Sequence, residues 1–176
     1  MSYRIELKAL VLVGLITMAA SCNNEPESNM PTQQQVNRSM EDINREFARD
    51  ERQMIESYIE QHGLEMASTG TGLRYFIYQE GQGEMALNGQ TASVNYKVSL
   101  LNGDEVYSSA ENGVKEFLIG RDNVETGIHE GILHMNVGSK GIFILPSHLA
   151  HGLSGDNDRI PPRSSVVYDI ELLSLK

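Results

Sequence analysis

Four of the five histidines in this chain are its candidate metal ligands: His129, His134, His148 and His151. Their spacings match no established zinc-ligand pattern, and no cysteine or acidic residue stands at a fixed distance from them. A serine hydrolase of the α/β type would carry its nucleophile in a G-x-S-x-G motif, which the chain lacks. The side chains therefore predict no metal site and no covalent hydrolase.

Two tyrosines lie on the apolar faces of segments in which apolar and polar side chains alternate, as in a β-strand. Residues 91–100 alternate between apolar and polar side chains, which places Tyr96 on the apolar face. Residues 165–175 place Tyr168 on an apolar face in the same way. From pattern alone, such tyrosines are more often core residues than site residues.

The segments around these tyrosines predict an α+β domain. Further strands are expected at residues 73–80, 117–119 and 141–145. A short amphipathic helix is expected at about residues 125–134, where apolar side chains recur at helical spacing. An antiparallel sheet with one apolar face covered by a helix accommodates this order of elements.

A series of short motifs runs through the same region. In order, they are Gly89-Gln90-Thr91, Tyr96, Asn102-Gly103, Val137-Gly138, Leu149-Ala150-His151-Gly152 and Ile160-Pro161-Pro162. The series resembles the FKBP-type peptidyl-prolyl cis-trans isomerases, and the resemblance covers about residues 73–176. It implies an FKBP-like antiparallel sheet wrapped on one short helix. It also implies an enzyme that rotates X-Pro bonds and needs no cofactor, metal or nucleophile.

Such an enzyme lowers the barrier to rotation of the amide by the polarity of the pocket that surrounds it. The barrier to rotation is about 18–20 kcal/mol because the amide must lose its resonance. A twisted amide is less polar than a planar one, so a dry apolar pocket favours the transition state over the ground state. Hydrogen-bond donors at the rim are then needed only to hold the substrate backbone.

The resemblance assigns the pocket residue by residue. The implied catalytic residues are Tyr96, Tyr107, His151 and Tyr168, and the implied substrate-binding residues are Val106, Val124, Glu125, Ile128 and Ile160. Tyr107 stands where the family usually has Asp, Glu125 where it has Ile, Ile128 where it has Trp, and His151 where it has Tyr.

These departures lead to three expectations. Tyr107 is expected to accept a hydrogen bond from the Tyr96 hydroxyl. His151 is expected to donate to the substrate backbone, and the backbone N–H of Glu125 to anchor the substrate carbonyl. A Glu125 carboxylate that points inward would spoil an apolar site.

The first residues predict export and lipidation. Arg4 and Lys8 precede the apolar run 9–20, which is too short to span a bilayer, and Ala19-Ala20-Ser21 leads to Cys22. Residues 1–21 are therefore predicted to be a lipoprotein signal peptide, with Cys22 as the acylated residue. The alternative is an ordinary signal peptide in which the one cysteine of the chain is incidental.

The segment that follows is predicted to be a tether and then a helical arm. Residues 22–35 are polar and contain two prolines, which is typical of a flexible tether. Residues 36–63 form an amphipathic helical arm in a helical pattern that starts at about Gln33. Its apolar stripe comprises Val36, Met40, Ile43, Phe47, Met54 and Tyr58. The stripe, interrupted at Asp50-Glu51, is expected to pack on the following domain or on a second copy.

The net charge of the chain limits the kinds of partner that it is expected to bind. The formal net charge of −10 at pH 7 gives no electrostatic reason to bind nucleic acid.

Val106-Tyr107-Ser108-Ser109, the lipidation motif and the helical arm together resemble the membrane-anchored, gliding-motility-associated branch of the family. The resemblance implies a protein lipid-anchored in the bacterial cell envelope, facing the periplasm or the cell surface. Its implied partners are X-Pro segments of envelope proteins.

Three functional hypotheses follow. The first is a prolyl isomerase that assists protein folding in the envelope. The second is a non-catalytic FKBP-fold chaperone or binding module, which the Tyr107 and Glu125 departures favour. The third makes the helical arm the functional part, as a dimer or partner contact, although a monomer is expected.

Overall fold

The computed structural model describes residues 30–176, so the predicted signal peptide and Cys22 lie outside the described residues. The chain divides into two units between Glu41 and Asp42, and Asp42–Lys176 is a compact unit. The elements are α1 (Gln33–Gln61), β1 (Ala67–Ser68), β2 (Arg74–Gln79), β3 (Thr91–Leu100), β4 (Glu105–Ser108), α2 (Ser109–Asn112), β5 (Lys115–Leu118), α3 (Thr126–Ile132), β6 (Lys140–Leu145), a 3-10 turn (Ser147–Leu149) and β7 (Val166–Leu175).

Helix α1 begins where a capping box satisfies its first free N–H groups. The Thr32 N–H donates to Gln35 Oε1 at 2.8 Å, and the Gln35 N–H donates back to Thr32 Oγ1 at 3.3 Å. The helix therefore starts at Gln33, inside the range 22–35 that was predicted to be a tether. It ends at Gln61, and Gly63 follows with a φ of +60°, the left-handed conformation that favours glycine.

The strands form one antiparallel sheet in the order β1-β2-β6-β7-β3-β4, and β5 pairs with β3. Strand β3 is long enough to hold β5 along its first half and β4 along its second half, on the same edge. The hairpin between β3 and β4 turns at Gly103, whose φ is +92°. Strands β4 and β5 and helix α2 thus form one rim of the sheet, and β4 and α2 were not predicted.

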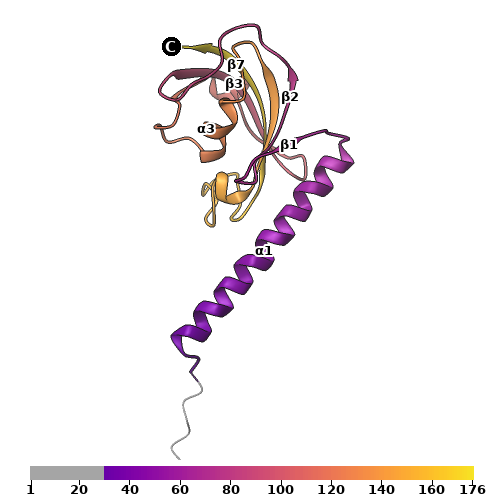
Figure 1. The fold of residues 1–176 in the computed structure, drawn as a ribbon, viewed down its shortest axis with the longest axis vertical. Coiled ribbons are helices and arrows are strands. Elements are labelled where there is room, and N and C mark those ends of the chain that lie inside the picture. The colour runs from indigo at the N-terminus through magenta and orange to yellow at the C-terminus, as the bar shows by residue number, and fades with distance from the viewer. Residues whose placement is uncertain (1–29) are drawn as a thin grey trace, which may run out of the picture. The chain divides into compact units, whose positions relative to one another are not determined.

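Helix α3 covers one face of the sheet (Figure 1). Two glycines one turn apart, Gly127 and Gly131, allow this close approach. A Cβ at Gly127 would lie 2.5 Å from Leu145, and a Cβ at Gly131 would lie 2.7 Å from Phe143. The main core is continuous between this helix and the inward side chains of β3, β6 and β7. The predicted α+β architecture is therefore observed.

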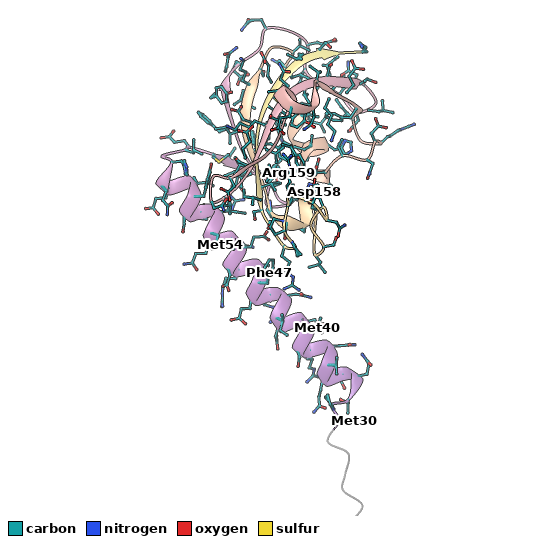
Figure 2. All side chains as sticks on the ribbon, turned by 180° about the vertical axis from the view of Figure 1, so that it is seen from behind. Met30, Met40, Phe47, Met54, Asp158 and Arg159 are labelled. Carbon is teal, nitrogen blue, oxygen red and sulfur yellow. The ribbon has the colours of Figure 1, made fainter. Side chains whose placement is uncertain are left out.

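The residues of α1 that are buried are not those of the predicted stripe. Glu51 and Ile55 are the buried side chains of this helix, and Ile55 packs with Ile144 and Val167 on the sheet face opposite α3. The stripe members Val36, Met40, Ile43 and Met54 are exposed. Met40, Phe47 and Met54 are labelled along the helix in Figure 2. Two stripe residues do pack on the domain: Tyr58 packs against the cluster of Ile55, and the Arg163 guanidinium lies 4.8 Å from the centre of the Phe47 ring. The prediction that the stripe packs on the domain is therefore confirmed for these two residues and not for the exposed ones, because the packing face is rotated toward Glu51 and Ile55.

Within residues 30–176, no helix combines the length and the apolar character needed to cross a membrane.

Candidate active site

A cavity of about 340 Å³ lies between α3 and the inner face of the sheet. Seven of the nine predicted pocket residues line it: Tyr96, Tyr107, Val124, Glu125, Ile128, His151 and Tyr168. They come from β3, β4, the start of α3, the segment after the 3-10 turn, and β7. The sequence motifs therefore identify side chains that the fold brings together.

The other two predicted residues lie in the core. Val106 is 5% exposed and Ile160 is 2% exposed, and neither lines the cavity. The Val106 carbonyl accepts a hydrogen bond from Arg159 Nη1 at 2.7 Å, and the Ile160 N–H donates to Asp156 Oδ1 at 2.8 Å. Both residues are part of the main core, and their predicted role in substrate binding stays a prediction.

The apolar surface of the cavity is formed mainly from β3, β5, β7 and α3. Ile128 is buried and projects from α3, and Tyr168 is buried on β7. Burial, and then the nearby Glu125 carboxylate, raises the pKa of Tyr168 well above its usual range. The Tyr168 hydroxyl therefore stays protonated at any physiological pH and can serve as a hydrogen-bond donor.

The Glu125 carboxylate faces the cavity. The Glu125 side chain is 12% exposed, and its Oε1 lies 3.0 Å from Nε2 of His151. The two atoms are close enough for an ion pair, but they are not aligned for a hydrogen bond, so the buried His151 Nε2 has no hydrogen-bond partner among residues 30–176. The inward carboxylate adds a charged group to a cavity whose remaining lining is largely apolar.

Tyr107 has a different partner from the one predicted. Its hydroxyl donates to Asp156 Oδ2 at 2.5 Å and lies 3.3 Å from Asp158 Oδ2. The expected hydrogen bond from Tyr96 is absent from the described residues. The partner was predicted wrongly: the loop after the 3-10 turn brings two carboxylates to Tyr107, and the Tyr107 hydroxyl is a donor to them.

Asp156 organises the loop that follows the 3-10 turn. Its Oδ1 accepts from the N–H groups of Asp158 and Ile160 while Oδ2 accepts from Tyr107. The guanidinium of Arg159 lies 5.4 Å from the centre of the Tyr107 ring. Asp158 and Arg159 are labelled in Figure 2. The loop is thereby attached to β4 beside the cavity.

We expect Asp156→Asn to lower the pKa of Tyr107 from about 12 toward 10. The hydrogen bond to Asp156 is the largest cause of the raised pKa, followed by burial. Because the folded-state pKa is raised, the stability from this contact is complete below about pH 10 and is lost as the pH rises to about 12. An ultraviolet absorbance titration of tyrosinate measures the shift.

Tyr78 provides the internal control for that titration. Burial and Asp169 raise the pKa of Tyr78 to about 12 as well, at a position on β2 with a different carboxylate partner. Its ionisation should be the same in Asp156→Asn, whereas Tyr107→Phe should lose one high-pH step. An Asp156→Asn curve identical to that of the unmodified chain would contradict the assignment.

Six further residues line the cavity without having been predicted as site residues: Val94, Val98, Asn112, Lys115, Phe117 and Ile170. The strand alternation already indicated that Val94, Val98 and Ile170 point inward. Asn112 and Lys115 lie at the rim, between α2 and the start of β5. No sequence signal identified them, because α2 itself was not predicted.

The other histidines of this region have structural roles. The Gly120 N–H donates to His129 Nδ1 at 2.9 Å, and His129 Nε2 lies 2.9 Å from the Asp122 carbonyl oxygen. His129 thus bridges the loop that leads into α3, and a neutral ring with its proton on Nε2 satisfies both contacts. In the described part of the chain, no three His, Cys, Asp or Glu side chains gather as a metal site would require.

Known proteins share this sequence and fold. The model of the family described as FKBP-type peptidyl-prolyl cis-trans isomerase matches residues 82–173, more than half of the chain. The FKBP-type peptidyl-prolyl cis-trans isomerase FkpA of Escherichia coli strain K12 is 35% identical over 121 residues, which are 69% of this chain and 43% of FkpA. The peptidyl-prolyl cis-trans isomerase FKBP1A of Xenopus laevis is 36% identical over 107 residues, 60% of this chain and 99% of that relative.

Solved structures agree with this relationship. The crystal structure of FkpA from Escherichia coli matches with a TM-score of 0.62 at 28% identity, over 83% of this chain and 74% of that one. The crystal structure of AtFKBP13 matches with a TM-score of 0.61 at 31% identity, over 64% of this chain and 99% of that one. The chain spans less than half the length of the FkpA sequence, but it covers nearly all of FKBP1A. The chain belongs to the FKBP-type peptidyl-prolyl cis-trans isomerase family, as its motifs predicted.

Proposed function

We propose that this protein catalyses cis-trans isomerisation of X-Pro bonds in folding proteins. The observation that carries the proposal is the cavity under α3, which combines an aromatic and aliphatic lining with few polar groups. The proline ring would lie against Ile128 and Tyr168, where the surroundings favour the less polar, twisted amide. The relatives that carry the name of this activity support the same proposal.

The polar groups at the cavity would hold the substrate backbone. No hydrogen bond within residues 30–176 uses the backbone N–H of Glu125, which makes it available to a substrate carbonyl. The Tyr168 hydroxyl and the His151 ring are the other donors at the cavity. Each would orient the X-Pro segment, and none needs to transfer a proton during rotation of the amide.

A non-catalytic binding module is the second candidate function. The observation that favours it is the Glu125 carboxylate, because a charged group beside the twisted amide weakens the preference for an apolar transition state. Such a module would hold proline-containing segments without accelerating their rotation. An isomerase and a binding module therefore differ in rate enhancement and not in affinity.

The experiment that separates the two is an isomerisation assay. The purified full chain is added to a short Leu-Pro peptide, and the cis-to-trans rate is measured by exchange nuclear magnetic resonance spectroscopy. We expect a clear acceleration that depends on protein concentration. A folded protein that shifts the peptide resonances but leaves the rate unchanged would support the binding module and contradict the isomerase.

We further propose that the protein works from a bacterial membrane as a lipoprotein. The support is the Cys22 motif together with the resemblance of Val106-Tyr107-Ser108-Ser109 to the gliding-motility-associated branch. Its substrates would be X-Pro segments of envelope proteins, on the periplasmic side or at the cell surface. Metabolic labelling with a fatty acid, lost in Cys22→Ala, tests the anchor.

The helical arm is proposed to act within a monomer. Ile55 and Glu51 of α1 are buried within the unit Asp42–Lys176, which ties this part of the arm to the sheet. Deleting residues 33–61 and measuring the mass in solution tests whether the arm has a role in assembly. A larger mass for the full chain, lost on deletion, would favour the dimer hypothesis.

A further inference from the structure

One wall of the cavity is anionic, although the cavity is otherwise suited to an uncharged proline ring. Glu125 occupies the position just before α3, and its carboxylate lies against His151 with only 12% of the side chain exposed. His151 Nε2 is buried and has no aligned hydrogen-bond partner in the described part of the chain. The Glu125 carboxylate therefore places a negative charge on the lining of the cavity, beside the surface that would hold the substrate.

The groups around this pair do not neutralise it. From β7, Tyr168 offers a neutral hydroxyl, and from β4, Tyr107 is already bonded to Asp156. The loop after the 3-10 turn contributes Asp156 and Asp158, which add negative charge. Each element packed against the pair thus presents either a neutral or an acidic group.

Two basic residues stand near the cavity, and neither reaches Glu125. Arg159 lies 3.2 Å from Glu111 and donates to the Val106 carbonyl. Lys115 is exposed at the start of β5, where water and salt screen its charge. The Glu125 carboxylate is screened much less because it is nearly buried, so its charge dominates the potential inside the cavity.

We propose that Glu125 makes this site selective for proline segments with a lysine or arginine directly before the proline. The inference rests on the proposed function, in which the Glu125 backbone N–H anchors the substrate. The carboxylate of the same residue is then held beside the residue that the rotating amide joins to proline. A basic side chain there would donate a charge-assisted hydrogen bond to the Glu125 carboxylate.

The test compares two peptides that differ only in charge. One has lysine before proline and the other has norleucine, whose side chain keeps the lysine stem without the ammonium group. Exchange spectroscopy on the purified full chain yields both the rate enhancement and the affinity for each peptide. We expect the lysine peptide to be preferred about tenfold at about pH 7.5.

Variants of Glu125 and His151 test which side chain causes the preference for the lysine peptide. Glu125→Gln should bring the preference close to onefold, and His151→Asn, which leaves the Glu125 carboxylate in place, should retain the preference for lysine. Glu80→Gln, which removes an exposed charge after β2, is the matched control and should behave like the unmodified chain. Circular dichroism and melting curves establish that each variant is folded.

The outcomes separate the inference from the proposed function. If both peptides are accelerated and Glu125→Gln keeps the original preference, the selectivity is refuted while the isomerase proposal stands. If neither peptide is accelerated but the lysine peptide binds more tightly through Glu125, the selectivity stands and the isomerase proposal is refuted. A protein that neither accelerates nor binds the peptides would overturn both.

Discussion

Replacing Glu51 with Ala is expected to lower the free energy of unfolding by about 3 kcal/mol. The Glu51 side chain is buried in α1, and its Oε1 accepts from the Ser147 N–H and from the Ser165 hydroxyl, each at 2.7 Å. Alanine would leave both buried donors without an acceptor and would open a small void. A loss of this size corresponds to a fall of about 10 °C in melting temperature.

Two variants identify the cause of that loss. Glu51→Gln keeps an oxygen acceptor in place, so we expect it to cost only about 1 kcal/mol. Asp50→Ala removes the neighbouring acid, which is exposed, and should change the stability by less than about 0.5 kcal/mol. Equal losses for Glu51→Ala and Asp50→Ala would contradict the assignment of the effect to the two hydrogen bonds.

Glu51 also connects α1 to the cavity. Ser147 begins the 3-10 turn that leads to His151, and Ser165 directly precedes β7, which carries Tyr168. One carboxylate of the arm therefore supports both segments that place these side chains at the cavity. For this reason the arm from Asp42 onward is part of the folded unit and not only a spacer.

The sequence predicted those elements whose signal is local. Strand β3 was predicted residue for residue, because its alternation and the following Asn102-Gly103 turn are both contained in about a dozen positions. The C-terminal end of α1 was likewise predicted, since the Gly63 that follows it adopts a left-handed conformation. Helix α2 was missed because four residues are too few to display a helical period.

The role of Glu51 could not be predicted from the sequence. In a helical pattern, an acid between apolar residues indicates an exposed position, and it was interpreted as a break in the apolar stripe. Its hydrogen-bond partners are 96 and 114 residues away in the chain. Burial of a charged group is favourable only when such partners are in place, and a local pattern does not contain them.

The sequence predicted which residues meet at the candidate site, but it did not predict which hydrogen bonds they make. Motif order placed Tyr107, Glu125 and His151 at one cavity, because order and spacing reflect the fold. The partner of each polar group depends on loops that pack across the sheet. For example, the Tyr107 hydroxyl donates its hydrogen bond to Asp156, which is 49 residues away in sequence, and it makes no hydrogen bond with Tyr96 among the described residues.

Tyr168→Leu is the second substitution for which we expect a large effect. Tyr168 is 7% exposed on β7 and contributes its ring to both the core and the cavity. Leucine keeps an apolar side chain in the core but removes the flat surface against which the proline ring would lie. We expect kcat/KM for a Leu-Pro peptide to fall about 30-fold, which corresponds to about 2 kcal/mol of transition-state stabilisation.

Tyr168→Phe separates the ring from the hydroxyl in the same assay. If the apolar surface dominates catalysis, the phenylalanine variant should retain kcat/KM within about threefold of the original, since it loses only one hydrogen-bond donor. A large loss in Tyr168→Phe, equal to that in Tyr168→Leu, would assign the effect to the hydroxyl and to its neighbour Glu125. Catalysis at this cavity would then depend on a polar contact, contrary to the apolar mechanism that we propose.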